Sequence, residues 1–269
     1  MAFVDAGGRA IWSERHGDGP GPVVLFLHGA GSNAATWWQQ LPGFAARHAC
    51  ITMDLRCFGR SRAPMSEFRH EHFVADALAV LDHHGADRAV VVGQSLGGMV
   101  GLRLALQRAD RVAAFVACDS PLGVDHPAIA QAIERRARTA TALTLEQRAL
   151  GAWFLQRDPE RAALYAQINA FNPGTHSVPA AEWRAAMDRL MDPADLLPMA
   201  ALRGLRMPVL WLVGREDPLV PVAAMQDCAA QVAGSELAVV DDCGHSTYFE
   251  KPGVFNHRVL DFIARRVAR

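Results

Sequence analysis

The chain has 269 residues, 51% of them hydrophobic and 20% charged, the balance of an ordinary globular protein. Its formal net charge of −1 gives no field that would attract nucleic acid or an anionic membrane surface, so a small-molecule substrate is the expected partner. No apolar stretch without a charge approaches the length of about 18 residues that a transmembrane helix needs, and the N-terminus lacks the pattern of a signal peptide. We therefore expect no membrane association.

The cysteines are odd in number and form no CxxC pair, which argues against a zinc site or a disulfide framework. They are Cys50, Cys57, Cys118, Cys228 and Cys243. Reduced thiols in a cytoplasmic protein are the expectation. His70 and His72 flank Glu71 but lack a third ligand at metal spacing, so no metal and no cofactor are predicted.

Short apolar runs alternate with helical patterns along most of the chain, which predicts a mostly parallel sheet with helices on both faces. A leading antiparallel hairpin is expected around Phe3–Val4 and Ala10–Glu14. The predicted buried strands are Val23–His28, Cys50–Asp54, Ala89–Gly93, Val112–Cys118, Val209–Val213 and Leu237–Val240.

Helices are predicted over Phe73–His83, Gly97–Gln107 and Val254–Arg266. The interval from 121 to 207 interrupts this alternation, because it is rich in Ala, Arg, Leu and Glu and has no β-branched run. Helices are predicted there over Ala128–Ala142, Leu145–Gln156 and Ala180–Leu190. The expected organisation is an α/β core of residues 1–120 and 208–269 with a helical cap insertion of residues 121–207.

The strongest chemical signal is Gly93-Gln94-Ser95-Leu96-Gly97, which fits the pattern G-x-S-x-G. The pentapeptide alone is a weak match, but here it lies between a predicted strand and a predicted helix. A serine at such a turn is held in a strained, exposed position, and the glycines allow the strand and the helix to approach closely. The motif predicts Ser95 as a nucleophile rather than a structural turn residue.

A serine hydroxyl needs a general base, and His245 on the loop after the last strand is the candidate. Asp217 stands just past the carboxyl end of Val209–Val213, where it can orient the imidazole. The alternatives are that Asp217 only caps a turn before Pro218, or that Asp119 or the weaker rival Glu216 takes its place.

An acyl-transfer site also needs donors for the developing oxyanion. The small residues of His28-Gly29-Ala30-Gly31-Ser32 let the backbone approach a substrate carbonyl, so the N–H groups of Ala30 and Leu96 are the predicted oxyanion hole. His28 is expected to hydrogen-bond loop backbone beneath the site. Asp54 and Arg56 are expected to shape the loop that follows the second strand.

With these motifs the chain resembles the α/β-hydrolase superfamily, and within it the capped single-domain serine hydrolases. The matching pieces are HGAGS, DLRCFGRS, GQSLGG, GREDPLVP and DCGHSTYFEKP, the last resembling the family's "GH…E-P" ending. Cys57 departs from the pattern at a position where glycine is common, which perturbs a loop without touching the predicted triad. The resemblance implies an α/β-hydrolase fold, and the serine at position 95 argues against the haloalkane dehalogenases and epoxide hydrolases of this superfamily, which use an aspartate there.

The resulting expectation is a serine hydrolase that cleaves a small to medium carboxylic ester or lactone through an acyl-enzyme. The alternatives are hydrolysis of a C–C bond in a vinylogous diketone, a lyase-type reaction on the same scaffold, or a hydrolase-fold receptor that holds a ligand. A monomer or homodimer is expected.

Overall fold

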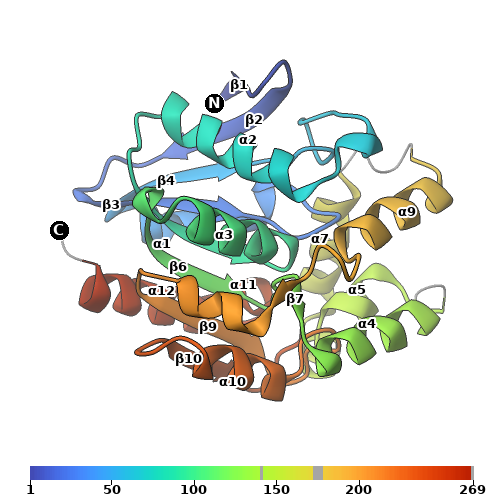
Figure 1. The fold of residues 1–269 in the computed structure, drawn as a ribbon. Coiled ribbons are helices and arrows are strands. Elements are labelled where there is room, and N and C mark those ends of the chain that lie inside the picture. The colour runs from blue at the N-terminus through green and yellow to red at the C-terminus, as the bar shows by residue number, and fades with distance from the viewer. Residues whose placement is uncertain (140–141, 172–177, 268–269) are drawn as a thin grey trace.

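The computed structural model describes residues 1–139, 142–171 and 178–267. Its centre is an eight-stranded sheet with the strand order β1-β2-β4-β3-β5-β6-β9-β10 (Figure 1). Strands β1, β2 and β4 pair antiparallel at one edge, and every other neighbouring pair is parallel. The strands are β1 (Ala2–Asp5), β2 (Ala10–His16), β3 (Gly21–Leu27), β4 (His48–Met53), β5 (Ala89–Gln94), β6 (Val112–Cys118), β9 (Val209–Gly214) and β10 (Glu236–Val240).

Alternate side chains of the central strands enter two separate hydrophobic clusters, one on each face of the sheet. Leu25 and Leu27 of β3 enter the cluster covered by α2, α3 and α10, whereas Val24 and Phe26 enter the cluster covered by α1 and α12. The period of two along a pleated strand explains this division. The helices are α1 (Leu41–Ala45), α2 (His70–His83), α3 (Leu96–Gln107), α10 (Val222–Ala230), α11 (Thr247–Glu250) and α12 (Pro252–Arg266).

Residues 121–207, between β6 and β9, form what we call the helical insertion. Figure 1 shows its helices gathered at one side of the sheet. Leu190 packs into one core cluster and Phe154 into the other, so the insertion rests on both layers. Its elements are β7 (Val124–Asp125), α4 (Pro127–Thr139), α5 (Leu145–Ala149), α6 (Ala152–Arg157), α7 (Pro159–Ala170), α9 (Ala180–Leu190) and β8 (Leu197–Pro198).

The single helix predicted over Leu145–Gln156 is wrong, because the structure has two helices there, α5 and α6. Leu150 and Gly151 are extended between them, and the Gly151 N–H donates to the Glu250 carboxylate rather than to a helical carbonyl. Helix α7 was not predicted at all, although Asp158 caps it and Pro159 begins it. The helix predicted over Ala128–Ala142 corresponds to α4, which begins at Pro127; residues 140 and 141 lie outside the described residues, and Ala142 is in a turn.

The loop after β4 is held by Asp54, whose carboxylate accepts the backbone N–H groups of Ala34 at 2.7 Å and Arg60 at 2.8 Å. Arg56 pairs with the buried Asp76 at 2.9 Å, so both predicted loop-shaping residues form hydrogen bonds as expected. Cys57 has a φ of 72°, a left-handed conformation that suits glycine better than cysteine.

All five cysteines are free and buried. Burial raises the pKa of each thiol above its ordinary value. Among the described residues, none of the helices is long and apolar enough to cross a membrane.

The close contact between β3 and α3 gives a testable prediction about Gly97. A methyl group there would lie 2.0 Å from the Leu27 carbonyl oxygen, and its three nearest atoms are all backbone atoms of Leu27 and His28, which cannot move aside as a flexible side chain could. We expect Gly97→Ala to lower the unfolding free energy by about 3 kcal/mol or more, measured by denaturant titration. The control is Gly43→Ala, because the nearest atom to an added methyl there is 3.8 Å away. A small effect of equal size in both variants would contradict the tight contact.

Candidate active site

Ser95 is the junction between β5 and α3, and its backbone has φ 50° and ψ −112°. This is a left-handed, strained conformation for a residue with a side chain. The Ser95 N–H donates to the Cys118 carbonyl at 3.0 Å, and the Ser95 carbonyl accepts the Ser120 hydroxyl at 2.6 Å. These bonds to the end of the neighbouring strand hold the turn in place. The residue itself is partly exposed amid a buried strand and helix.

His245 lies on the loop between β10 and α11 and is 4% exposed. Its Nδ1 lies 2.8 Å from Oδ2 of Asp217, and its Nε2 lies 3.0 Å from Oγ of Ser95. An ionised carboxylate can only accept, so Nδ1 carries the proton and leaves Nε2 free to accept the serine hydroxyl proton. The structure therefore brings together the serine, histidine and aspartate singled out in the sequence.

Asp217 follows β9 and has a fully buried carboxylate. Its Oδ1 accepts the N–H groups of Leu219 at 2.8 Å and Val220 at 3.0 Å, while Oδ2 faces His245. One carboxylate oxygen thus accepts hydrogen bonds from the turn that includes Pro218, and the other contacts the imidazole of His245. The same side chain therefore caps the turn and contacts the His245 ring.

The rival carboxylate, Asp119, is buried just after β6 and forms its hydrogen bonds with groups other than the His245 ring. Its Oδ1 accepts the Gly214 N–H at 2.9 Å, and its Oδ2 accepts the N–H and the hydroxyl of Thr247, both at 2.8 Å. Burial raises the pKa of Asp119, and the nearby charge of Asp217 raises it further. Asp119 therefore connects the loop that carries Asp217 to the loop that carries His245. The other rival, Glu216, is exposed and accepts the Ala152 N–H of the insertion at 3.0 Å.

The backbone around Gly29 runs directly against the serine turn, since a methyl group at Gly29 would lie 3.2 Å from the Ser95 Cβ. Ala30 follows in this loop, and Leu96 is the first residue of α3. Within the described parts of the chain, neither the Ala30 nor the Leu96 N–H donates to a protein acceptor. Within these parts of the chain, the hydrogen-bonding capacity of both N–H groups is therefore unused.

His28 lies beneath this loop and is completely buried. Its Nδ1 donates to the Gly29 carbonyl at 2.8 Å, and its Nε2 accepts the Leu55 N–H at 2.9 Å. Burial lowers the pKa of His28, which keeps the ring neutral, as these two bonds require. The prediction that His28 hydrogen-bonds loop backbone is confirmed.

Two contacts at the site were not anticipated from the sequence. The Gln94 amide donates to the His245 carbonyl at 2.8 Å, and the Ser246 hydroxyl donates to the Tyr165 hydroxyl at 3.3 Å. Gln94 belongs to the serine motif itself, so its position offered a signal. Tyr165 belongs to α7, the helix that was not predicted.

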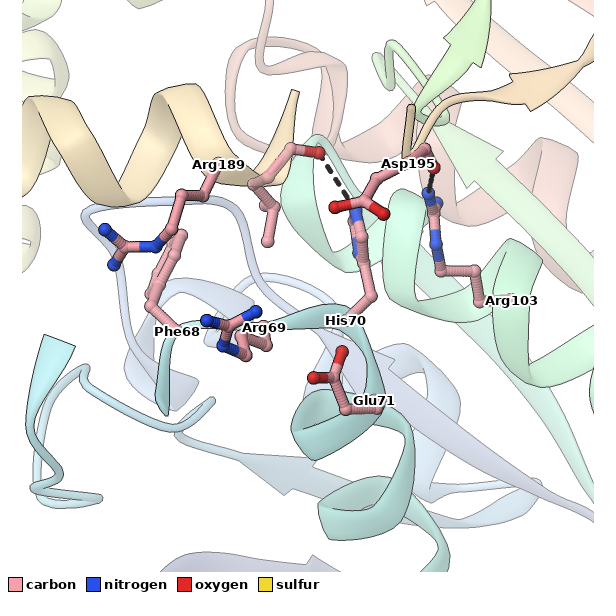
Figure 2. A pocket seen from close by; sticks show the side chains of 8 residues that line it. Phe68, Arg69, His70, Glu71, Arg103, Arg189 and Asp195 are labelled. Atoms are coloured by element: carbon pink, nitrogen blue, oxygen red, sulfur yellow. Dashed lines mark hydrogen bonds between the residues drawn. The ribbon is translucent and has the colours of Figure 1, made fainter. Parts of the chain in front are cut away.

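A separate cavity of about 210 Å³ lies between α2, α3 and α9, and Figure 2 shows side chains that line it. Arg103 is eight residues along α3 from Ser95, which corresponds to roughly 12 Å of helix. Arg69, Arg103 and Arg189 share the lining with the carboxylates of Glu71 and Asp195, so no single ligand charge is favoured. In the described residues, no group of three His, Cys, Asp or Glu side chains is arranged to hold a metal.

The alpha/beta hydrolase fold family matches residues 22–252 of the chain. The 2-hydroxymuconate semialdehyde hydrolase of a Pseudomonas species (strain CF600) is 30% identical over 94% of this chain and 91% of its own. The 3-oxoadipate enol-lactonase 2 of Acinetobacter baylyi is 27% identical over 88% of this chain and 87% of its own. Among solved structures, Est816, described as an N-acyl homoserine lactone degrading enzyme, superposes with a TM-score of 0.81 at 29% identity, covering 96% of this chain and 99% of Est816. These findings confirm the predicted fold and the predicted kinship, and the chain belongs to the alpha/beta hydrolase family.

Proposed function

We propose that this enzyme hydrolyses a small to medium carboxylic ester or lactone through an acyl-enzyme on Ser95. The observation that carries the proposal is the unbroken sequence of contacts from the Ser95 hydroxyl to His245 at 3.0 Å and from His245 to Asp217 at 2.8 Å. It is supported by relatives that are named as an enol-lactonase and a lactone-degrading enzyme.

In this mechanism Ser95 Oγ attacks the substrate carbonyl while His245 Nε2 takes the hydroxyl proton. Asp217 stabilises the imidazolium through the Nδ1–H bond. The N–H groups of Ala30 and Leu96 stabilise the oxyanion, and His245 then returns its proton to the departing alkoxide. Water activated by His245 hydrolyses the acyl-enzyme and regenerates the serine.

In our proposal residues 1–120 and 208–269 are the catalytic core, and residues 121–207 form a cap that covers the substrate and shapes its pocket. The packing of the insertion against both core clusters supports this division. A cytoplasmic location, with a monomer or homodimer as the working form, remains part of the proposal.

The second candidate is hydrolysis of a C–C bond in a vinylogous diketone, favoured by the 30% identity to a semialdehyde hydrolase. Product analysis with a ring-cleavage diketone and with a p-nitrophenyl ester separates the two reactions. A ligand receptor would instead give one slow turnover and a trapped acyl adduct. Multiple turnover on either substrate excludes that alternative.

Removal of the nucleophile tests the proposal directly. We expect Ser95→Ala to lower kcat by about 10⁴- to 10⁶-fold and to abolish labelling by a fluorophosphonate probe. Ser66→Ala is the control, because Ser66 is an exposed serine in the short 3₁₀ helix Met65–Glu67, outside the site. Near-wild-type turnover by Ser95→Ala on every accepted ester would reject the assignment.

We expect the same substitution, aspartate to asparagine, to have different effects at Asp217 and at Asp119. Asp217→Asn should lower kcat by about 10⁴-fold, because the amide no longer holds the required tautomer. Asp119→Asn should mainly lower the unfolding free energy, by about 1–3 kcal/mol, because an amide group faces backbone donors. Steady-state kinetics and denaturant unfolding of both variants measure the difference. If folded Asp119→Asn loses more kcat than Asp217→Asn, the carboxylate has been assigned wrongly.

A further inference from the structure

Glu250 is a buried carboxylate that the proposed mechanism does not use. It ends α11, five residues after His245, and is only 2% exposed. In the parts of the chain that the structure describes, no arginine, lysine or histidine forms an ion pair with it. The neighbouring Lys251 places its ammonium 3.5 Å from the centre of the Trp153 ring instead. Backbone N–H groups therefore supply the stabilisation of this charge.

These N–H groups come from two segments that are far apart in sequence. Glu250 Oε1 accepts from Gly244 at 3.0 Å and Ser246 at 3.2 Å, the residues on either side of His245. Oε2 accepts from Gly244 at 3.0 Å and from Gly151 of the insertion at 2.9 Å. One carboxylate thus binds two segments: the backbone on either side of His245, and Gly151 at the break between α5 and α6.

The two segments also touch each other without intervening side chains. A methyl group at Gly244 would lie 2.4 Å from the Gly151 nitrogen, and one at Gly151 would lie 2.8 Å from the Gly244 nitrogen. The His245 N–H donates to the Ala149 carbonyl of the insertion at 2.9 Å. The loop that carries His245, which we call the histidine loop, is therefore fixed against the insertion by backbone contacts. The Glu250 carboxylate adds hydrogen bonds to both segments.

A glutamine in the same place could not make the same contacts. Both carboxylate oxygens accept N–H groups, whereas a glutamine offers one acceptor oxygen and an NH₂ group that would face a donor. Burial raises the pKa of Glu250 to about 7, because loss of solvent disfavours the ionised form. A buried charge is weak evidence for a purely stabilising role, because an uncharged residue often serves stability as well or better.

We propose that Glu250 is a positioning residue that fixes His245 and couples its orientation to the seating of the helical insertion at Gly151. This inference rests on the proposed function, since it assigns His245 the part of general base. Displacement of the insertion would remove the Gly151 and Ala149 contacts, and the imidazole would lose part of its support.

The test compares Glu250→Gln with the matched variant Glu216→Gln. The Glu216 carboxylate also binds the insertion, through the Ala152 N–H at 3.0 Å, but this side chain is exposed and forms no hydrogen bond with the histidine loop. Only the Glu216 backbone N–H reaches that loop, at the Cys243 carbonyl, and the substitution leaves it unchanged. For each variant, kcat and KM are measured on an accepted ester, and kcat is divided by the number of sites titrated with a fluorophosphonate. We expect Glu250→Gln to lower kcat per titrated site by roughly 10- to 100-fold with little change in KM, because misplacement of a catalytic group slows the chemical step. Glu216→Gln should leave both constants unchanged.

A purely structural role would change the melting temperature and the number of titratable sites, but not kcat per site. Wild-type kcat per site in Glu250→Gln would therefore overturn the inference. If Glu250→Gln does not fold, Glu250→Asp is measured in the same way, and full activity per site or failure to fold in that variant would also overturn it. Failure of the proposed function is distinct, because the wild-type enzyme itself would then show neither turnover nor labelling of Ser95.

Discussion

The site depends on one sharp backbone turn at Ser95, where the chain passes from β5 into α3 with a positive φ of 50°. The turn is possible only because the residues around it that approach other parts of the chain most closely are glycines. A methyl group at Gly93 would lie 2.3 Å from the Gly97 carbonyl oxygen, and one at Gly98 would lie 2.4 Å from the Ser120 side chain. Glycine is thus required at these positions because a side chain would collide with neighbouring atoms. Ser95 is partly exposed, whereas Gln94 and Leu96 beside it are buried.

Asp217 and His245, which contact each other beside Ser95, lie on the loops that follow β9 and β10, and buried polar groups fix these loops. Asp119 holds the start of one loop at Gly214 and the end of the other at Thr247. Gln94 holds the His245 carbonyl from the serine side. The position of the imidazole therefore depends on these contacts from the ends of β5 and β6 as well as on Asp217. The two carboxylates that follow the neighbouring strands β6 and β9, Asp119 and Asp217, thus have different partners: Asp119 binds the loops and Asp217 binds the ring.

Much of this arrangement was predictable from the sequence, because the strands are short apolar runs and the serine motif has an unmistakable local context. The choice between Asp217 and Asp119 was less determined, since both follow a strand, and only the 2.8 Å contact with His245 separates them. The break at Gly151 was not predictable from helical periodicity, because its cause is a hydrogen bond to Glu250, 99 residues away. Glu250 itself was visible only as part of a family-like ending, and its burial and its partners depend on tertiary structure.

The free cysteines have a practical consequence for labelling experiments on the helical insertion. Each thiol is buried and has a raised pKa, so very little reactive thiolate is present at neutral pH. Two introduced cysteines, one on the exposed surface of α4 or α9 and one on the exposed surface of the core, would react with maleimide dyes far faster than the native residues. Distances between the insertion and the core then become measurable by fluorescence without first removing any natural side chain.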